Sequence, residues 1–212
     1  MDALLTRPLV ETAVAEAPRA GEVASGDRSV LASTSSGILV GVVDGLGHGE
    51  EAATAAKRAE SVLLSDPSES VTSLVRRCHL ELRATRGAVL SLASIDALEG
   101  LMTWLGVGNV AGILVRADHR AQPPVESLVL RAGVLGARLP HLQAAMLSIR
   151  PGDLLVFATD GIRADFQTEL TAESALPAGT ALQPLADRIL SRYATGSDDA
   201  LALVVRYVGV GP

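Results

Sequence analysis

The order of the predicted elements is the feature that most restricts the fold of this chain. Strand patterns come first, two helical patterns follow, and then come many strands, two more helices and a last strand. A doubly wound fold would need strand and helix to alternate regularly. Consecutive strands joined by short turns instead favour antiparallel sheets with helices packed outside them. The sequence therefore predicts an α+β fold.

The boundaries of these elements follow from turn residues and from helix start and stop signals. Pro67 ends the first helical pattern, and Ser68 is the expected N-cap of the second. Strands are predicted at 8–17, 21–33, 35–45, 87–96, 100–108, 109–118, 126–133, 144–150, 151–162 and 198–208. Helices are predicted at 48–64, 68–85, 165–174 and 181–194.

Composition limits the classes of protein to which the chain can belong. It has 212 residues, 48% of them hydrophobic and 20% charged, which suits one globular domain over residues 1–212. The net charge of -6 and the 2% of aromatic residues argue against a nucleic-acid partner and a polybasic membrane surface. The single cysteine excludes an internal disulfide. No run is apolar enough for a membrane span or a signal peptide, so we expect a cytoplasmic protein.

Acidic residues lie at the ends of several predicted strands. Asp44-Gly45 and Asp160-Gly161 each end a buried strand, and Asp198-Asp199 come directly before another. Asp27 also lies at the start of a strand. In an antiparallel sheet the end of one strand lies beside the start of its neighbour, so we expect these acids to meet at one edge. An Asp-Gly pair alone is a common turn, and only the repetition of the pattern indicates a site.

Several carboxylates in one place repel one another and require a cation to hold them together. Carboxylates, carbonyls and water are hard oxygen ligands, which select Mg, Mn or Ca rather than Zn. A glycine after the acid allows a backbone carbonyl to turn toward a metal, because glycine has no Cβ that would clash. A phosphate cradle is disfavoured because a bare phosphate beside Asp44, Glu50 and Glu51 would be repelled by their negative charges. The glycine spacing also fails the dinucleotide-binding pattern.

Four ordered motifs carry a resemblance to a known family. The stretches "SGD" at Asp27, "VVDGLGHG" at Asp44, "FATDG" at Asp160 and "SDDALALVV" at Asp198 resemble the metal-dependent PPM protein phosphatases, and in particular their SpoIIE-like branch. Within that branch, "RGAVLSL" from Arg86 and "GVGNVAGILV" from Gly106 resemble the RsbX-type stressosome phosphatases.

The resemblance implies an α-β-β-α sandwich of two antiparallel sheets, with two divalent ions, Mn2+ or Mg2+, at one end. By position, Asp44 would bridge both metals, the carbonyl of Gly45 would bind one, and Asp160 and Asp198 would hold the other. Asp27 would bind or support a metal, and Asp199 ranks below Asp198 as a ligand.

Gly26 stands where many members carry an acid, so the second metal is expected to be weakly held or mostly water-ligated. Arg28 is the candidate for the arginine that binds the phosphate in this family.

The function that the resemblance implies is a metal-dependent serine/threonine protein phosphatase. A water activated by the metals would attack phosphoserine or phosphothreonine on a phosphorylated STAS-domain stressosome protein. A catalytically silent binding module with the same fold, or a phosphatase for a small phosphomonoester, are the alternatives. His48 could protonate the leaving group, but its place at a helix start favours a capping or supporting role.

Overall fold

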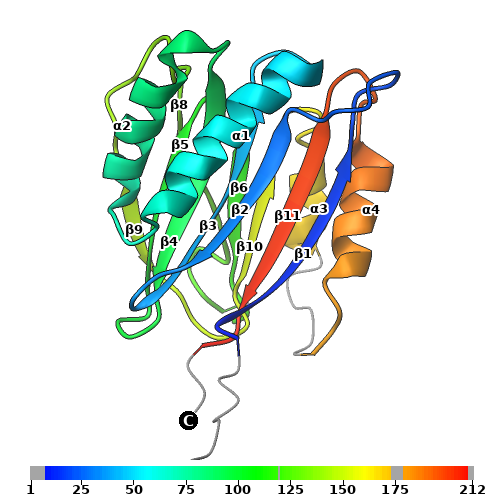
Figure 1. Ribbon diagram of the computed structural model, residues 1–212. Helices are drawn as coiled ribbons and strands as arrows, with labels where there is room; N and C mark the ends of the chain where they lie inside the picture. The colour runs from blue at the N-terminus through cyan, green and yellow to red at the C-terminus, as the bar shows by residue number, and fades with distance from the viewer. Residues whose placement is uncertain (1–7, 119, 173–178, 210–212) are drawn as a thin grey trace, which may run out of the picture.

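Two β-sheets packed face to face form the centre of the molecule (Figure 1). The computed structural model describes residues 8–118, 120–172 and 179–209. In spatial order, the first sheet contains β1 (Val10–Ala17), β11 (Ala200–Tyr207), β10 (Leu154–Ala158), β6 (Ala111–Val115) and β7 (Val125–Ser127). The second contains β2 (Asp27–Ser33), β3 (Gly37–Gly45), β4 (Ala88–Asp96), β5 (Leu101–Val107) and β8 (Leu130–Arg131), with β9 (Ala145–Ser148) also paired to β5.

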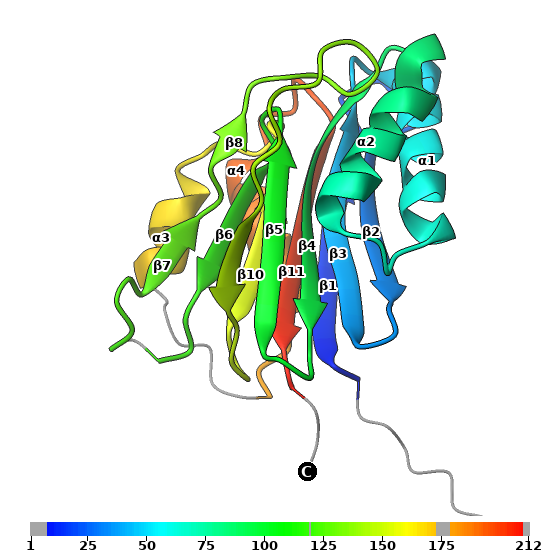
Figure 2. The ribbon, with the colours of Figure 1, turned by 90° about the vertical axis from the view of Figure 1, so that its left-hand side faces the viewer.

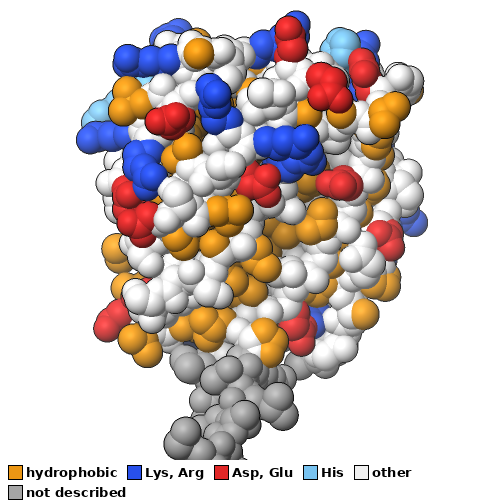
Figure 3. Space-filling model, in the orientation of Figure 1, with side chains coloured by type: hydrophobic (Ala, Val, Ile, Leu, Met, Phe, Trp, Pro, Cys, Tyr) orange, Lys and Arg blue, Asp and Glu red, His pale blue; other side chains and the backbone are white. Residues whose placement is uncertain are grey.

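Helices cover the outer face of each sheet (Figures 1 and 2). The second sheet is covered by α1 (Gly49–Ser65), α2 (Val71–Glu81) and the short 3-10 helix η1 (Leu82–Ala84), and the first by α3 (Phe166–Ala172) and α4 (Gln183–Tyr193). The buried side of α1 is rich in alanine, which allows the helix to lie close to the sheet. On the side of the molecule that faces the viewer, Figure 3 shows more charged side chains over the upper half, where α1 and α2 lie in Figure 1, than over the lower half. Within the described ranges, no helix is both long and apolar enough to cross a membrane.

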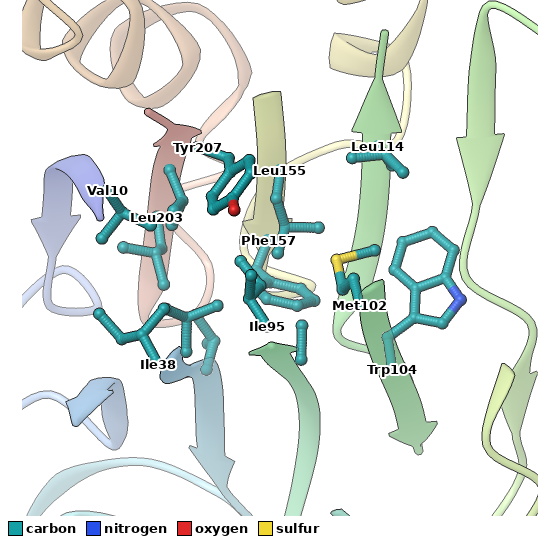
Figure 4. Packing of buried hydrophobic residues seen from close by; sticks show 14 of the residues in the cluster. Val10, Ile38, Ile95, Met102, Trp104, Leu114, Leu155, Phe157, Leu203 and Tyr207 are labelled. Atoms are coloured by element: carbon teal, nitrogen blue, oxygen red, sulfur yellow. The ribbon is translucent and has the colours of Figure 1, made fainter. Parts of the chain in front are cut away.

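The main hydrophobic core lies between the two sheets. Alternate residues of the strands point inward, so Val40 and Val42 of β3 face Leu155 and Phe157 of β10 across the interior. Figure 4 shows side chains from both sheets, such as Phe157 and Ile95, pointing into this shared space. Two further clusters join α1 and α2 to the second sheet and α3 and α4 to the first.

The fold class predicted from the sequence is confirmed, with some corrections. The β5–β8 pair is parallel, so the second sheet is mixed rather than purely antiparallel. Ser70, and not Ser68, is the N-cap of α2, because its side chain accepts the bond from the Ser73 amide. The predicted strand at 126–133 is divided into β7 and β8, which belong to different sheets. The last two residues of the predicted helix 165–174 lie outside the described residues.

The topology brings four strand termini to one end of the sandwich, the upper end in Figure 1. β3 and β10 end there, while β2 and β11 begin there, because both pairs are antiparallel. The chain after β8 crosses the same end (Figure 2). Asp27 is directly opposite Asp44 in the β2–β3 register, so the acids at the strand ends are brought together by backbone pairing.

Replacing Phe157 with alanine tests the core between the sheets. Phe157 is fully buried, and its removal leaves a cavity that two facing sheets cannot close. We expect Phe157→Ala to lower the free energy of unfolding by about 3–5 kcal/mol. Urea denaturation measures this value, with the exposed Met146→Ala as control, for which the expected change is within about 0.5 kcal/mol. A small loss for Phe157→Ala would contradict this packing.

Candidate active site

Three carboxylates from three strand ends line one pocket. Asp44 lies near the end of β3, Asp160 follows β10 and Asp198 precedes β11. The pocket has a volume of about 430 Å³. Its other lining residues are Leu46, Gly47, Val89, Gly108, Asn109, Ala132, Gly133 and Val134. The structure therefore brings together the three acids that the sequence placed at strand ends, and closes one side of the pocket with the loop after β8.

Burial and mutual repulsion control the protonation of Asp44. Burial, followed by the charges of Asp27 and Asp160, raises the pKa of Asp44 to about 9. The pKa of Asp160 is also raised, first by burial and then by the charge of Asp198, while a hydrogen bond from Asn109 opposes the rise. Without a cation, the site is thus electrostatically strained in its fully ionised form.

Asp27 is buried behind the pocket and links the two sheets. The hydroxyl of Thr159, just after β10, donates to Asp27 Oδ2 at 2.8 Å and accepts from the Leu201 amide at 2.9 Å. Burial raises the pKa of Asp27 to about 7, although the Thr159 bond lowers it. Asp27 does not line the pocket, but it is paired with Asp44 across the β2–β3 strands and so lies directly beside it. The sequence analysis missed Thr159, which precedes Asp160 directly.

Asp199 has both carboxylate oxygens engaged by backbone amides. Its Oδ1 accepts from the Arg19 amide and its Oδ2 from the Gly26 amide, each at 2.8 Å. These bonds fasten the β1–β2 connection to the start of β11. Asp199 is 4% exposed and does not line the pocket, whereas Asp198 does. Asp199 therefore holds the loop, and its ranking below Asp198 as a metal ligand stays a prediction.

Asn109 is a pocket residue that the sequence analysis did not single out. Its side-chain amide donates to Asp160 Oδ2 at 2.6 Å, and it lies in the turn between β5 and β6. Such a bond fixes the orientation of the Asp160 carboxylate and stabilises its ionised form. The signal in the sequence was weak, because a polar residue between two strands is also common in an ordinary turn.

The glycines of the two Asp-Gly pairs are required by close backbone packing. A Cβ at Gly45 would overlap the carbonyl of Ala52 in α1, and a Cβ at Gly161 would overlap the carbonyl of Asp199. This is a different reason from the carbonyl orientation expected from the sequence. Gly26 is similarly enclosed, since a Cβ there would lie 2.8 Å from that of Ala52. An acidic side chain therefore has no room at position 26.

His48 neither caps α1 nor lines the pocket. It occupies the N-cap position, but its side chain makes no capping bond. Its Nδ1 instead lies 2.7 Å from Glu22 Oε1 in the β1–β2 connection. The expected capping role is therefore wrong, and the contact with Glu22 is a link between two loops at this end of the molecule.

Arg28 points away from the acids. Side chains alternate along a strand, and Arg28 is paired with Val43, whose side chain belongs to the cluster under α1 and α2. Its Nη1 donates to the backbone carbonyl of Asp27 at 3.2 Å. The orientation of the Arg28 side chain therefore does not support a role in binding the phosphate.

The residues at the pocket fit a hard divalent cation surrounded largely by water. Among the described residues, no three His, Cys, Asp or Glu side chains are close enough together to form a complete ligand set for one ion. Mg2+ commonly binds through one or two carboxylates and retains several waters. Asp44, Asp160 and Asp198 offer carboxylate oxygens of this kind, and a cation would relieve their repulsion.

A two-sheet sandwich with acids meeting at one end is the arrangement expected of PPM-type phosphatases, and comparisons with known proteins agree. Residues 34–208 match the family described as Stage II sporulation protein E (SpoIIE). The phosphoserine phosphatase RsbX of Bacillus subtilis is 23% identical over 196 residues, which cover 92% of this chain and 94% of RsbX.

Solved structures show the same fold. A chain from a structure described as the bacterial stressosome, "a modular system that has been adapted to control secondary messenger signaling", superimposes with a TM-score of 0.80 at 31% identity, covering 93% of this chain and 99% of that one. A crystal structure of RsbX in complex with magnesium superimposes with a TM-score of 0.79 at 21% identity, covering 93% and 94%. The chain belongs to the SpoIIE family of PPM-type protein phosphatases, as its motifs predicted.

The pH dependence of stability tests the electrostatics of Asp44. A carboxyl whose pKa rises from 3.8 to about 9 on folding favours the folded state below pH 3.8, and this contribution is lost as the pH rises toward 9. We expect the metal-free protein to lose stability over this range, and Asp44→Asn to make the loss smaller. Urea denaturation in EDTA at several pH values measures both slopes. Equal slopes for the two proteins would contradict the raised pKa.

Removing the Asn109 amide tests its effect on Asp160. We expect Asn109→Ala to reduce the rate of phosphate release about 10- to 100-fold, as for the loss of other groups that orient a metal ligand. The folded structure should persist, because Asn109 is exposed. The exposed Ser127→Ala, in β7, is the control. An unchanged rate for Asn109→Ala would show that the Asp160 orientation does not depend on this bond.

Proposed function

We propose that this protein is a metal-dependent phosphoserine/phosphothreonine phosphatase that acts on a phosphorylated STAS-domain protein of a stressosome. The observation that carries the proposal is the pocket in which Asp44, Asp160 and Asp198 converge from three strand ends. No Lys or Arg lines this pocket in the described part of the chain, so bound cations must supply the positive charge that a phosphate needs.

The metal ligands are proposed from the position of these residues in the family motifs. Asp44 would be shared by both ions, the Gly45 carbonyl would bind one, and Asp160 and Asp198 would hold the other. Asp27 supports Asp44 from behind, and Asp199 contributes mainly by holding the loop at Gly26. The proposed cofactor is a pair of divalent ions, Mg2+ or Mn2+, and the crystal structure of RsbX in complex with magnesium supports Mg2+.

The residues of the chain prepare the site for hydrolysis. Divalent cations, when bound, lower the pKa of a coordinated water and neutralise charge on phosphate oxygens. Asp44 has to release its proton before it binds a cation, because its pKa is raised in the metal-free site. Asn109 keeps Asp160 aimed in one direction. Leu46, Val89 and Val134 form the apolar part of the pocket lining.

The substrate class rests on the relatives. RsbX is named a phosphoserine phosphatase. The solved chain that is 31% identical comes from a structure described as the bacterial stressosome. A phosphorylated protein of that assembly is therefore the proposed partner. We further propose that residues 1–212 form a single phosphatase domain that works in the cytoplasm without nucleic acid or membrane, in agreement with the continuous core between the sheets.

Phosphate release from a phosphoserine STAS-domain protein, measured with Mg2+, with Mn2+ and with EDTA, tests the proposal. We expect release only with metal. Asp44→Asn should reduce it by more than about 100-fold, because removal of a ligand costs more than removal of a group that orients one. The exposed Asp187→Asn on α4 is the matched control and should retain the full rate.

The outcomes separate the proposal from its alternatives. Release that persists in EDTA or in Asp44→Asn would overturn the metal assignment. Metal binding without release from the phosphoprotein, but with release from p-nitrophenyl phosphate, would indicate a small-phosphomonoester phosphatase. Neither metal binding nor release would indicate a binding module that has kept the fold.

A further inference from the structure

A second hollow adjoins the acidic pocket, and we call it the flanking groove. It lies between the first turns of α1 and the turn that follows η1, and its volume is about 440 Å³. Its lining residues are Glu50, Glu51, Thr54, Ala84, Thr85 and Arg86. None of them is a proposed metal ligand, and the chemistry at the pocket does not require the groove.

The contact between Arg86 and Gly47 places the groove next to the pocket. Gly47 lines the pocket, and a Cβ on it would lie 2.6 Å from Arg86 Nη1. The guanidinium therefore lies directly against the pocket wall at this glycine. The Leu46 amide donates to the Gly87 carbonyl at 3.0 Å, which holds the two loops side by side. A chain segment can thus pass from the pocket over Gly47 and Arg86 into the groove.

The charge of the groove is negative. Arg86 Nε forms an ion pair with Glu51, so these two charges offset one another. Glu50 is exposed on the same turn of α1, and the described residues provide no ion pair for it. One carboxylate therefore faces the groove without a counter-ion, and it would attract a cationic side chain of a bound molecule and repel an anionic one.

We propose that the flanking groove binds the polypeptide next to the phosphorylated residue, and that Glu50 makes it select a basic residue there. This inference rests on the proposed phosphatase function of the pocket. A phosphorylated side chain reaches into the pocket while its backbone stays on the rim, and each neighbouring residue extends the chain by about 3.3–3.6 Å. Residues close to the phosphoserine therefore reach the groove, whereas a small phosphomonoester does not.

Two phosphoserine peptides test the inference. They are identical except that the residues two positions before and after the phosphoserine are Lys in one and Glu in the other. The readout is the ratio of kcat/KM for the two peptides, which cancels any change in the shared chemistry. We expect the wild-type protein to prefer the Lys peptide by about two- to fivefold, the range of an exposed ion pair.

Reversing the charge of Glu50 should reverse the preference. Glu50→Lys is expected to favour the Glu peptide by a similar factor. Glu60→Lys is the matched control, because it changes the net charge equally and lies in α1 well beyond the groove. It should keep the wild-type preference. A ratio near one in the wild-type protein, or a ratio that Glu50→Lys and Glu60→Lys shift alike, would overturn the inference.

Binding measurements separate this inference from the proposed function. Fluorescence anisotropy on the wild-type protein, with labelled peptides that carry serine in place of phosphoserine, reports the preference of the groove without turnover. If no peptide is hydrolysed by the wild-type protein but the Lys peptide binds more tightly and Glu50→Lys reverses this, the phosphatase proposal fails and the groove stands. If peptides are hydrolysed without any preference, the groove inference fails and the phosphatase proposal stands.

Discussion

The unfavourable burial of several carboxylates at one end of a hydrophobic sandwich is the constraint on which the rest of the site depends. Burial raises the pKa of Asp44 to about 9 and that of Asp27 to about 7, and neighbouring acids add to both shifts. A fold can keep such groups together only if hydrogen bonds or cations compensate for their repulsion. Thr159 supplies such a bond to Asp27 and Asn109 supplies one to Asp160.

These compensating bonds also join the parts of the fold that carry the acids. The Thr159–Asp27 bond connects the first sheet to the second, and Asp199 connects the start of β11 to the β1–β2 loop. The lack of a side chain at Gly45 allows the end of β3 to lie against the Ala52 carbonyl of α1. The lack of one at Gly161 allows the segment after β10 to lie against the Asp199 carbonyl at the start of β11. The geometry of the pocket is therefore set by the packing of the two sheets, so a change in that packing would alter the spacing of the acids.

The pocket and the flanking groove divide recognition between two kinds of surface. The pocket is lined by three acids together with small and apolar residues, a lining in which a phosphate would need bound cations. The groove offers charged and polar side chains beyond Arg86, where a polypeptide can extend.

The sequence by itself determined the order of helices and strands along the chain, the α+β class and the placement of Asp44, Asp160 and Asp198 at strand ends, because alternating hydrophobic patterns and strand-end acids are local signals. It left open which acids face the pocket. Only the tertiary structure decided that Asp199 holds a loop, that His48 pairs with Glu22 and that Arg28 faces the helices. It also supplied Thr159, Asn109 and the contact between Gly47 and Arg86, since each depends on residues far apart in the chain meeting through the pairing and packing of two sheets.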